Sequence, residues 1–543
     1  MQFDDILKTV GEFGKYQKTK YFLICLFGIL TAFQALVSVF SLNTPEHRCA
    51  LADSVFNGTD TWESQSPEHL QLIEKYIPTD ESGKLSKCEI FNSEGNKTEC
   101  DRWVYDQTEL KSTVVTDLNL VCSNTFKATA SSSMFMFGNL AGSFLSGLVS
   151  DFLGRRKTLL ISIMGSAVSS IAMSFAPEYY SFTILRFFCG AFNMSLFLTG
   201  FVLGMEMIGP QHRLFVGIVI EFFWAIGFLL LIAIGYAIRI WKYIQLAISL
   251  PTLLFISYYW LLPESARWLL VKGRNAEAEQ VILNVAKTNG KVVPTDILSK
   301  LEEPKRAEKL KALKRAPRLL CRTLVILFNW FVIAMTYYGL SLNSGNLPGS
   351  LYVNLTISAV AEVIGYSLCF LCFVSGRKAM HVVAMIIGGL AIISSVPVLY
   401  LFQGSESQKN TIFVVLNNIG KVGVTIGFAV IYFWSAEIFP TMLRNSLMGI
   451  SSTFARVGSI FAPVIADLAK LVPSKYSSVL PPLIFGIFTI SAGLLSLILP
   501  ETTDKVLPET IAEANVFPER LENEENEMME NDKAKGFFEN TKM

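Results

Sequence analysis

The chain has 543 residues, of which 51% are hydrophobic and 17% are charged, whereas an ordinary soluble protein carries about 25% charged residues. Long apolar runs recur from Tyr21 to Pro500, which excludes a string of soluble domains and predicts one polytopic membrane domain. The formal net charge of +1 excludes a strongly basic protein that binds nucleic acid.

Apolar stretches of helical length divide the chain. A helix needs roughly 20 predominantly apolar residues to cross a hydrocarbon core of about 30 Å, because its backbone amides must be bonded within the segment. Twelve stretches meet this requirement, so the sequence predicts an all-α membrane protein with 12 transmembrane helices embedded in a lipid bilayer. The predicted spans are 20–42, 127–149, 158–176, 180–205, 214–237, 243–262, 323–343, 351–374, 379–402, 411–434, 447–471 and 478–499.

Charge is segregated between the two long segments outside the spans. Residues 43–124 contain seven Lys or Arg against 15 Asp or Glu, whereas residues 263–322 contain 14 against seven. Lys and Arg accumulate in cytoplasmic loops, and the cluster Arg155, Arg156 and Lys157 falls on the same side as 263–322. We therefore expect 43–124 to be extracellular, both termini to be cytoplasmic, and the first span to be a retained helix.

The extracellular segment carries the marks of a secreted domain. Cys49, Cys88, Cys100 and Cys122 all lie in it, where oxidation is permitted, and four cysteines allow three pairings between which the sequence does not choose. Two glycosylation acceptor sequences begin at Asn57 and Asn96. The prediction is a small glycosylated domain with two disulfides.

Three pairs of polar motifs repeat at the ends of corresponding spans. Glu206 and Arg213 recur as Glu437 and Arg444, Pro263-Glu-Ser recurs as Pro500-Glu-Thr, and Gly154-Arg-Arg recurs as Gly376-Arg-Lys. The offset along the chain is nearly the same for the three pairs, which indicates two six-helix halves, although Pro-Glu and Gly-Arg are also common at helix ends. Parallel repeats of this kind are typical of transporters whose site lies between the halves.

The same motifs carry a family resemblance. Gly147-Leu-Val-Ser-Asp151-Phe-Leu-Gly-Arg-Arg-Lys157 resembles the signature of the major facilitator superfamily, and Arg186 with Gly190 resembles a second motif of that superfamily. Other segments are similar to those of solute carrier family 22, the organic cation, organic anion and carnitine transporters, and in particular to its insect-type members. These segments begin at Ser112, Pro263, Tyr337 and Ala436. The resemblance implies the major facilitator fold and covers nearly the whole chain up to Pro508.

These assignments predict the organisation of the chain. The expected parts are a cytoplasmic N-terminus (1–19), an N-terminal half (20–262) that includes the extracellular loop 43–124, a cytoplasmic linker (263–322), a C-terminal half (323–500) and a cytoplasmic tail (501–543). Helical spacing between 275 and 320 predicts short helices in the linker. The Glu-rich composition after Pro508 predicts disorder.

Charged residues at the cytoplasmic ends of the spans are predicted to form latches that open and close as the halves rock. The expected gating residues are Asp151, Arg155, Arg156, Arg186, Glu206, Arg213, Glu437 and Arg444. The C-terminal repeat lacks an acidic residue corresponding to Asp151, so we expect its latch to depend more on Glu437 and Arg444.

Four charged residues stand out because they lie deep within predicted spans: Glu221, Glu362, Lys421 and Arg456. A charged side chain near the bilayer centre costs roughly 2.5–3.5 kcal/mol on insertion scales, so each of the four should face the interior of the bundle. They are predicted to bind substrate. The alternative is that they pair with one another, for example Glu362 with Lys421, and contact no substrate.

Arg456 bears most directly on the charge of the substrate. The resemblance implies that this position is an aspartate in dedicated cation transporters and an arginine in anion and carnitine transporters. A guanidinium offers a planar fork to a carboxylate, and it repels a bare cation. Because Glu221 or Glu362 could hold an ammonium group, a zwitterion satisfies both signs, and a plain organic anion is the main rival.

Aromatic residues are expected to complete a broad pocket, because ring faces hold quaternary ammonium groups and apolar bodies. The family resemblance points to Tyr337, Tyr338 and Phe428, and spacing near Glu221 points to Trp224. For most of the 41 Phe, helix packing is the expected role.

Motifs of other classes are missing from the sequence. It contains no phosphate-binding loop, no histidines at metal-ligand spacing and no cluster resembling a catalytic triad. We therefore expect no enzyme activity, cofactor, metal or nucleic-acid partner, although a coupling ion such as sodium remains open. The sequence predicts a monomeric plasma-membrane carrier that moves small organic ions by alternating access, with a ligand-binding receptor that does not transport as the alternative class.

Overall fold

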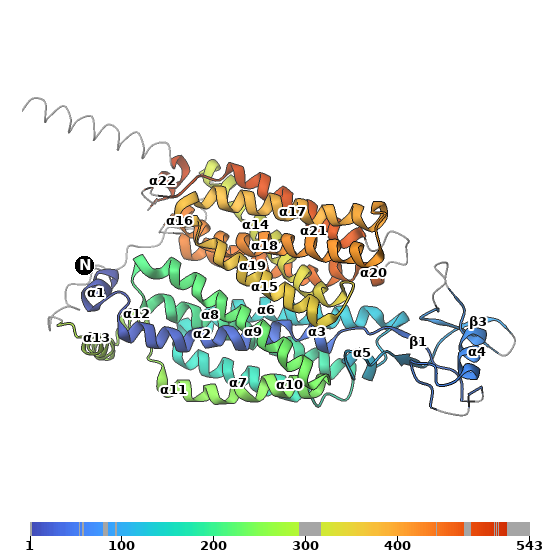
Figure 1. Cartoon of the computed structure of the whole chain (residues 1–543). Helices are drawn as coiled ribbons and strands as arrows, with labels where there is room; N and C mark the ends of the chain where they lie inside the picture. The colour runs from blue at the N-terminus through green and yellow to red at the C-terminus, as the bar shows by residue number, and fades with distance from the viewer. Residues whose placement is uncertain are drawn as a thin grey trace, which may run out of the picture.

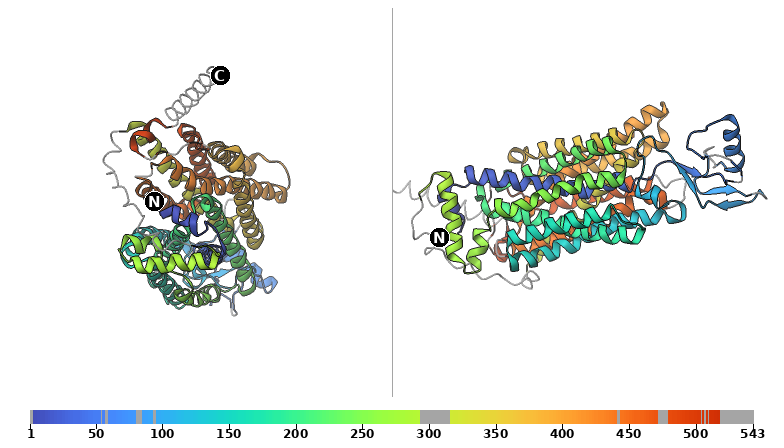
Figure 2. Two further views of the ribbon diagram at one scale, coloured as in Figure 1. Left: turned by 90° about the vertical axis from the view of Figure 1, so that its left-hand side faces the viewer. Right: turned by 90° about the horizontal axis from the view of Figure 1, so that it is seen from below.

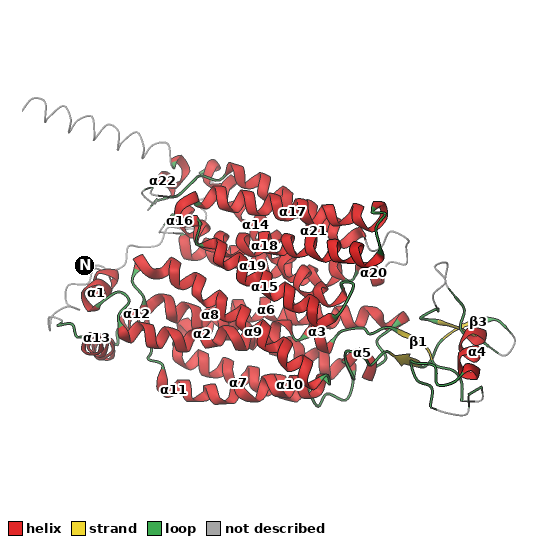
Figure 3. Cartoon of the chain, in the orientation of Figure 1, coloured by secondary structure: helices red, strands yellow, loops and turns green. Residues whose placement is uncertain are grey.

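The computed structural model describes residues 3–53, 55–56, 59–79, 85–92, 95–292, 316–440, 443–471, 479–503, 505, 508 and 510–517. Long helices run side by side along one axis, and a small mixed domain projects from one end of the bundle (Figures 1 and 3). Within the described chain, 11 helices are long and apolar enough to cross a membrane. The remaining predicted span, 158–176, the third in chain order, forms helix α7 (Arg155–Met173), whose buried serines lower its hydropathy.

The N-terminal half contains six spans. They are α2 (Lys15–Leu36) continued by α3 (Ser38–Ser41), α6 (Thr125–Leu153), α7, α8 (Tyr179–Met207), α9 (Arg213–Ile238), and a broken sixth span. The sixth span, predicted as one helix over 243–262, consists of α10 (Trp241–Ser249), the 3₁₀ segment η3 (Leu250–Ser257) and α11 (Tyr258–Leu261). The change of helix type falls at Pro251, whose nitrogen cannot donate a backbone hydrogen bond.

The C-terminal half repeats this plan. Its spans are α14 (Pro317–Asn343), α15 (Leu351–Cys369) followed by α16 (Cys372–Ser375), α17 (Arg377–Leu401), α18 (Glu406–Ile438), α19 (Arg444–Ala466) followed by α20 (Leu468–Leu471), and α21 (Leu480–Leu495). Short 3₁₀ segments η6 (Ser344–Asn346) and η8 (Ser496–Ile498) follow α14 and α21. Seen along the bundle, the two halves lie next to each other, one in blue to green and the other in yellow to red (Figure 2).

Glycines permit the closest helix contacts. A Cβ atom at Gly142 of α6 would lie 2.1 Å from the carbonyl oxygen of Ala191 on α8, and one at Gly458 of α19 would lie 2.1 Å from that of Phe331 on α14. A larger side chain at either position would collide with the backbone of the neighbouring helix and push the two helices apart. The small residues therefore fix the spacing of one helix pair in each half.

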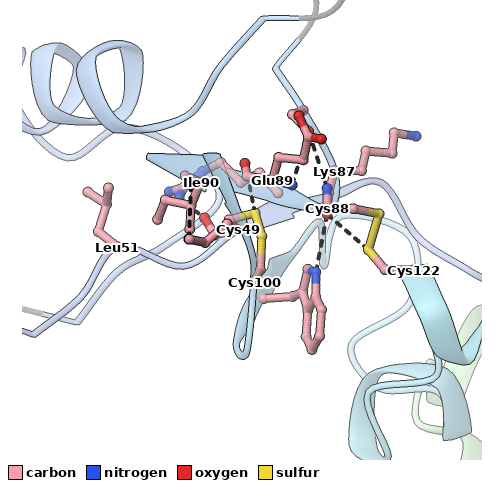
Figure 4. The surroundings of a disulfide bond; sticks show 12 residues. Cys49, Leu51, Lys87, Cys88, Glu89, Ile90, Cys100 and Cys122 are labelled. Carbon is pink, nitrogen blue, oxygen red and sulfur yellow. Dashed lines mark hydrogen bonds between the residues drawn. A yellow bond between two sulfur atoms is a disulfide. The ribbon is translucent and has the colours of Figure 1, made fainter. Parts of the chain in front are cut away.

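The projecting domain, which we call the disulfide domain, is built from residues of the 43–124 segment. Strand β1 (His47–Cys49) pairs antiparallel with β4 (Trp103–Tyr105), β2 (Glu89–Phe91) pairs with β3 (Lys97–Glu99), and α4 (Pro67–Tyr76) and α5 (Val114–Asp117) complete it. Of the three possible pairings, the disulfides are Cys49–Cys100 and Cys88–Cys122 (Figure 4). The second bond ties the domain to the residues immediately before α6.

The two predicted glycosylation sites fall differently with respect to the described chain. Asn96 is exposed in the turn before β3, so its side chain is accessible for modification. Asn57 lies outside the described residues.

Short helices cover the opposite end of the bundle (Figure 1). They are α1 (Phe3–Val10), α12 (Ala266–Val271), α13 (Asn275–Asn289) and α22 (Ile511–Val516). Helix α13 lies where the linker was predicted to be helical, while 293–315 and 518–543 are outside the described residues. The expectation of disorder after Pro508 was wrong for α22, because Asn515 and Ala514 bond to the beginning of α14.

Candidate functional site

A small cavity of about 40 Å³ lies between the two halves. We call it the central cavity. Its lining residues from the N-terminal half are Thr31, Ala35, Asn139, Asn193, Met194, Phe197, Glu221 and Trp224. Those from the C-terminal half are Tyr337, Tyr338, Tyr366, Phe428, Tyr432 and Arg456. Because both halves contribute to the cavity, its shape changes when the halves move relative to each other, as alternating access requires.

Six of the eight predicted substrate-binding residues line this cavity. Glu221 and Trp224 enter from α9, whereas the other four are on helices of the C-terminal half: Tyr337, Tyr338, Phe428 and Arg456. The structure thus brings together side chains from the fifth span of one half and from three spans of the other, which lie far apart in the sequence.

The cavity holds two opposite charges that do not pair with each other. Arg456 is 3% exposed, and its Nε atom has no hydrogen-bond partner within the described protein. Among the described residues, neither Arg456 nor Glu221 has a group of opposite charge within ion-pair distance. The hydroxyl groups of Tyr432 and Tyr366 are the polar neighbours of Arg456 and Glu221, respectively. A cation and an anion therefore face one cavity from opposite halves.

Aromatic rings form a continuous wall beside these charges. The ring centroids of Tyr337 and Phe428 are 5.3 Å apart, and those of Phe428 and Tyr432 are 5.7 Å apart. Tyr338 lies edge-on to Tyr337 at 5.3 Å. Across the cavity, Trp224 meets Phe197 edge-on at 6.3 Å. Such a wall offers π-faces to a cation or an apolar body without demanding one precise shape.

Glu362 and Lys421, the other two predicted residues, pair with each other. Lys421 Nζ lies 2.8 Å from Glu362 Oε1 and donates to Ser358 Oγ at 2.5 Å. The same ammonium lies 5.1 Å from the centroid of the Phe228 ring and 5.8 Å from that of Tyr337. Neither charged residue is part of the cavity wall. Pairing is therefore the arrangement that the structure favours for these two, and Tyr337 is their link to the cavity.

Five polar wall residues were missed by sequence reasoning: Thr31, Asn139, Asn193, Tyr366 and Tyr432. A signal for the asparagines existed, since a buried amide in an apolar span is costly unless it is bonded. No comparable signal marks the two tyrosines, because interior and lipid-facing tyrosines look alike in sequence.

Charged clusters lie at the end of each half opposite the disulfide domain. In the N-terminal half, Arg155 contacts Glu206 at 3.0 Å and Asp151 at 2.8 Å, while Glu264 accepts the backbone N–H of Arg155 at 2.8 Å. This cluster joins α6, α7, α8 and the residues after α11 within one half.

The C-terminal half repeats the cluster without the residue that corresponds to Asp151. Arg377 lies 3.3 Å from Glu437, and Glu501 accepts the backbone N–H groups of Arg377 at 3.1 Å and of Lys378 at 3.0 Å. Thr502 donates to Glu437. Glu437 pairs with Arg377, whereas Arg444, the other residue on which this latch was expected to depend, donates to the carbonyl oxygen of Phe439 at 3.4 Å.

Three further residues predicted to gate make contacts of other kinds, and the backbone N–H of Arg156 also donates to Glu264 Oε2 at 3.2 Å. Arg156 donates to the Tyr259 carbonyl oxygen at 2.6 Å and stacks on the ring of the same tyrosine, 4.1 Å from its centroid. Arg213 donates to the Ile208 carbonyl oxygen at 3.2 Å. The buried Arg186 donates to Ser38 and lies over the ring of Phe135, so it belongs to the interior of the N-terminal half and to neither charged cluster.

At the end near the disulfide domain, hydrogen bonds cross between the halves. Thr129 Oγ1 donates to Asp467 Oδ2 at 2.7 Å, and Ser133 Oγ donates to the Ile460 carbonyl oxygen at 3.2 Å. Glu109 accepts the backbone N–H of Leu351 at 2.8 Å. These contacts hold α6 against α19 and the disulfide domain against α15.

Comparisons with known proteins define the class. The sequence profile of the family described as "Sugar (and other) transporter" matches residues 80–511. A proton:xylose symporter of the major facilitator superfamily, solved with 6-bromo-6-deoxy-D-glucose, has a TM-score of 0.59 at 16% identity, covering 92% of this chain and 98% of its own. A partially occluded, inward-open xylose transporter from E. coli has a TM-score of 0.60 at 15% identity, covering 91% and 100%. The fold is that of a major facilitator transporter, which is not an enzyme.

Sequence relatives narrow the family. Organic cation transporter protein of Drosophila melanogaster is 38% identical over 535 residues, covering 95% of each chain. Organic cation/carnitine transporter 2 of Homo sapiens is 32% identical, and solute carrier family 22 member 21 of Mus musculus is 33% identical, each covering 94% of this chain and 93% of the relative. The chain belongs to solute carrier family 22, and the fold and family predicted from the sequence are confirmed.

Proposed function

We propose that this protein carries small organic zwitterions, and cations of similar size, across the plasma membrane by alternating access, with both termini in the cytoplasm. The observation that carries the proposal is the pair of opposite charges, Glu221 and Arg456, which face one cavity from the two halves without contacting each other. A substrate with a carboxylate at one end and an ammonium at the other would neutralise both charges at once.

Charge chemistry supports this substrate class. The planar guanidinium of Arg456 is suited to two parallel hydrogen bonds with a carboxylate. Glu221 and the rings of Tyr337 and Phe428 suit a cationic end, because a carboxylate and π-faces both attract an ammonium group. Two relatives named for organic cation and carnitine transport are similar in sequence to this chain over nearly their whole length.

The size of the cavity favours a closed state that must open for the substrate. Pockets for small organic ligands are typically about 300–1,000 Å³, and the central cavity is about 40 Å³. Substrate entry therefore requires the two halves to part. The hydrogen bonds that cross near Asp467 and Glu109 would break when the extracellular side opens.

Uptake into cells or vesicles that contain the protein tests the proposal. The probes are matched in size: a zwitterion with one carboxylate and one ammonium, the corresponding amine without the carboxylate, and the corresponding acid without the amine. We expect saturable, temperature-dependent accumulation and counterflow, with the zwitterion the best substrate. Binding without accumulation would mean a receptor, and no response to any probe would reject the proposal.

A second candidate is exchange of organic anions. Because Lys421 neutralises Glu362, Arg456 is the charge of the central region that most needs a carboxylate. In that case the acid without an amine would be the best substrate in the same panel. Repeating the panel with and without sodium separates sodium-coupled uptake from uniport and exchange.

A further inference from the structure

Two asparagines of the N-terminal half contribute a feature that the charges do not explain. Asn139 on α6 and Asn193 on α8 both line the central cavity, and each is 4% exposed. The side-chain oxygen of each residue is buried and has no hydrogen-bond partner within the described protein. Buried amide oxygens are normally bonded, so two unbonded ones on one cavity wall point to a ligand that supplies the missing donors.

The side-chain nitrogens of Asn139 and Asn193 have hydrogen-bond partners in the protein, whereas their side-chain oxygens have none. Asn193 Nδ2 donates to the Thr31 carbonyl oxygen at 3.3 Å. Asn139 Nδ2 donates to Met136 Sδ at 3.6 Å. Rotating the Asn193 amide by half a turn would place its oxygen against the Thr31 carbonyl oxygen, two acceptors facing each other. The neighbouring backbone therefore selects the orientation in which Asn193 offers an acceptor to the cavity.

An acceptor of this kind distinguishes groups that a negative charge alone does not. A primary or secondary ammonium and a hydroxyl carry N–H or O–H donors, whereas a quaternary ammonium carries none. Glu221 and the aromatic wall attract both types of cation. Discrimination between the two types comes from groups that accept a hydrogen bond, and Asn139 and Asn193 add two such acceptors to the carboxylate of Glu221 in the N-terminal wall.

We propose that Asn139 and Asn193 form a donor-selecting sub-site, which favours substrates with N–H or O–H groups over their quaternary ammonium counterparts. The inference rests on the proposed function in so far as the central cavity is the transport site. It adds two neutral acceptors to the charged groups of Glu221 and Arg456, so the preference for N–H and O–H donors should depend on the two asparagines as well as on the charge of the substrate.

The test compares two probes that differ only in their donors. They are 4-aminobutanoate and its N-trimethyl derivative, which have the same carboxylate and the same chain length. Their ratio of kcat/KM is measured for the wild type, for Asn139→Leu and Asn193→Leu, which keep the branching and the number of side-chain heavy atoms, and for Asn417→Leu as a matched control. Asn417 is a buried asparagine on α18 that donates to the Phe413 carbonyl oxygen and does not line the cavity.

We expect the wild type to favour the primary amine and each cavity variant to lower that ratio by roughly five- to tenfold, the size of one lost hydrogen bond. The loss should fall on the primary amine, and Asn417→Leu should keep the wild-type ratio. If a leucine variant does not reach the membrane, Asn139→Ala and Asn193→Ala replace it. Shifts in Tm on adding each probe to the purified protein give the same ratio for binding when transport is slow.

The possible failures are distinguishable. If the cavity variants transport both probes with the wild-type ratio, the sub-site is rejected and the proposed function stands. If the wild type prefers the trimethyl derivative, the sub-site is likewise rejected. If the wild type neither transports nor binds either probe, both the sub-site and the proposed function are rejected.

Discussion

At the scale of single residues, Arg456 is expected to decide which charges the protein accepts. It is buried in the central cavity, and no described carboxylate pairs with it. Arg456→Asp should lower kcat/KM for a zwitterion about 100-fold, because a carboxylate then faces a like charge, while a matched cation should lose little or gain. Arg456→Lys, which keeps the charge and loses the planar fork, should fall between the two. An unchanged order of preference in Arg456→Asp would mean that this residue is structural.

A second residue, Asp60, is expected to control the acid stability of the disulfide domain. It accepts hydrogen bonds from Arg48 Nη1 at 3.0 Å, from the Leu51 backbone N–H at 2.8 Å and from His69 Nε2 at 3.0 Å. Burial on its own raises the pKa of the Asp60 carboxyl, but these bonds and the charge of Arg48 outweigh it and hold the pKa below its usual value of 3.8. The charged form is therefore the one that stabilises the fold.

The sign of the pH dependence follows from that lowered pKa. The stability that Asp60 contributes is fully present above the pKa of the unfolded chain and is lost as the pH falls through the lower pKa of the folded domain. We expect hydrogen exchange in 47–53, corrected for intrinsic rates, to stay slow down to about pH 4 and to accelerate below it. Asp60→Asn should exchange faster at neutral pH and show a weaker acid response. Equal acid responses in the two proteins would contradict this role of Asp60.

At the scale of elements, an asparagine caps the first helix of each half from a distant segment. Asn289, at the end of α13, accepts the backbone N–H of Tyr16 at 3.0 Å, in the first turn of α2. Asn515, in α22, accepts those of Arg318 at 3.0 Å and Leu319 at 3.2 Å, in the first turn of α14. Both asparagines follow the last span of their own half. The repeat therefore extends beyond the spans to the segments that hold their ends.

Removal of either cap should lower the thermal stability of the protein by a measurable amount. Loss of an N-cap typically costs about 1 kcal/mol, so Asn289→Ala and Asn515→Ala should each lower the Tm of the purified protein by a few degrees. Asn284→Ala is a suitable control, because Asn284 is exposed on the same helix as Asn289 and its side chain caps no described helix. A Tm equal to that of Asn284→Ala would show that water replaces the caps at no cost.

The elements also show how far the sequence could predict this fold. Spans were predictable because hydrocarbon thickness sets their length, and the two halves because polar motifs recur at helix ends. The break at Pro251 could not be predicted, because a membrane helix tolerates proline when neighbouring groups bond to the backbone carbonyl that the proline leaves without a partner. The capping role of Asn515 could not be predicted either, because Arg318, whose backbone N–H it accepts, lies 197 residues away in the sequence.

The same distinction holds for the site. The position of Glu221 and Arg456 in the interior of the bundle was predictable, because a charged side chain in a span costs free energy when it faces lipid. The pairing of Glu362 with Lys421 was one of two alternatives, and only the contact between α15 and α18 favours it. The contribution of Asn139 and Asn193 depends on which amide atom remains unbonded, and that depends on atoms contributed by other turns and helices.

At the scale of the whole molecule, the structure separates contacts within each half from contacts between the halves. The charged clusters around Arg155 and Arg377 each join segments of one half, so they favour rigid-body motion of that half. The bonds of Thr129 with Asp467 and of Glu109 with Leu351 cross between the halves. The crossing bonds must therefore break when the end near the disulfide domain opens, and they set the free energy of that step.

Asp467 is the crossing residue whose removal should shift the balance most. A hydrogen bond to a charged group contributes about 1.5–3 kcal/mol, so Asp467→Asn should raise the population open toward the disulfide domain by roughly tenfold. A cysteine introduced as Ala128→Cys reports this, because Ala128 lines the gap beside Thr129 and Asp467 and is 8% exposed. Its reaction with a membrane-impermeant maleimide, applied from the side of the disulfide domain, should become faster by the same factor.

The control for this experiment is Asp117→Asn at the same end of the molecule. Asp117 accepts a bond from Trp241 and pairs with Lys242, so its contacts remain within the N-terminal half and should not alter the rate at Ala128→Cys. A substrate that binds in the central cavity and closes the halves around itself should slow labelling in both backgrounds. If Asp467→Asn labels no faster than Asp117→Asn, the Thr129–Asp467 bond does not hold this end closed, and the closure must come from the contacts of Glu109 and Ser133.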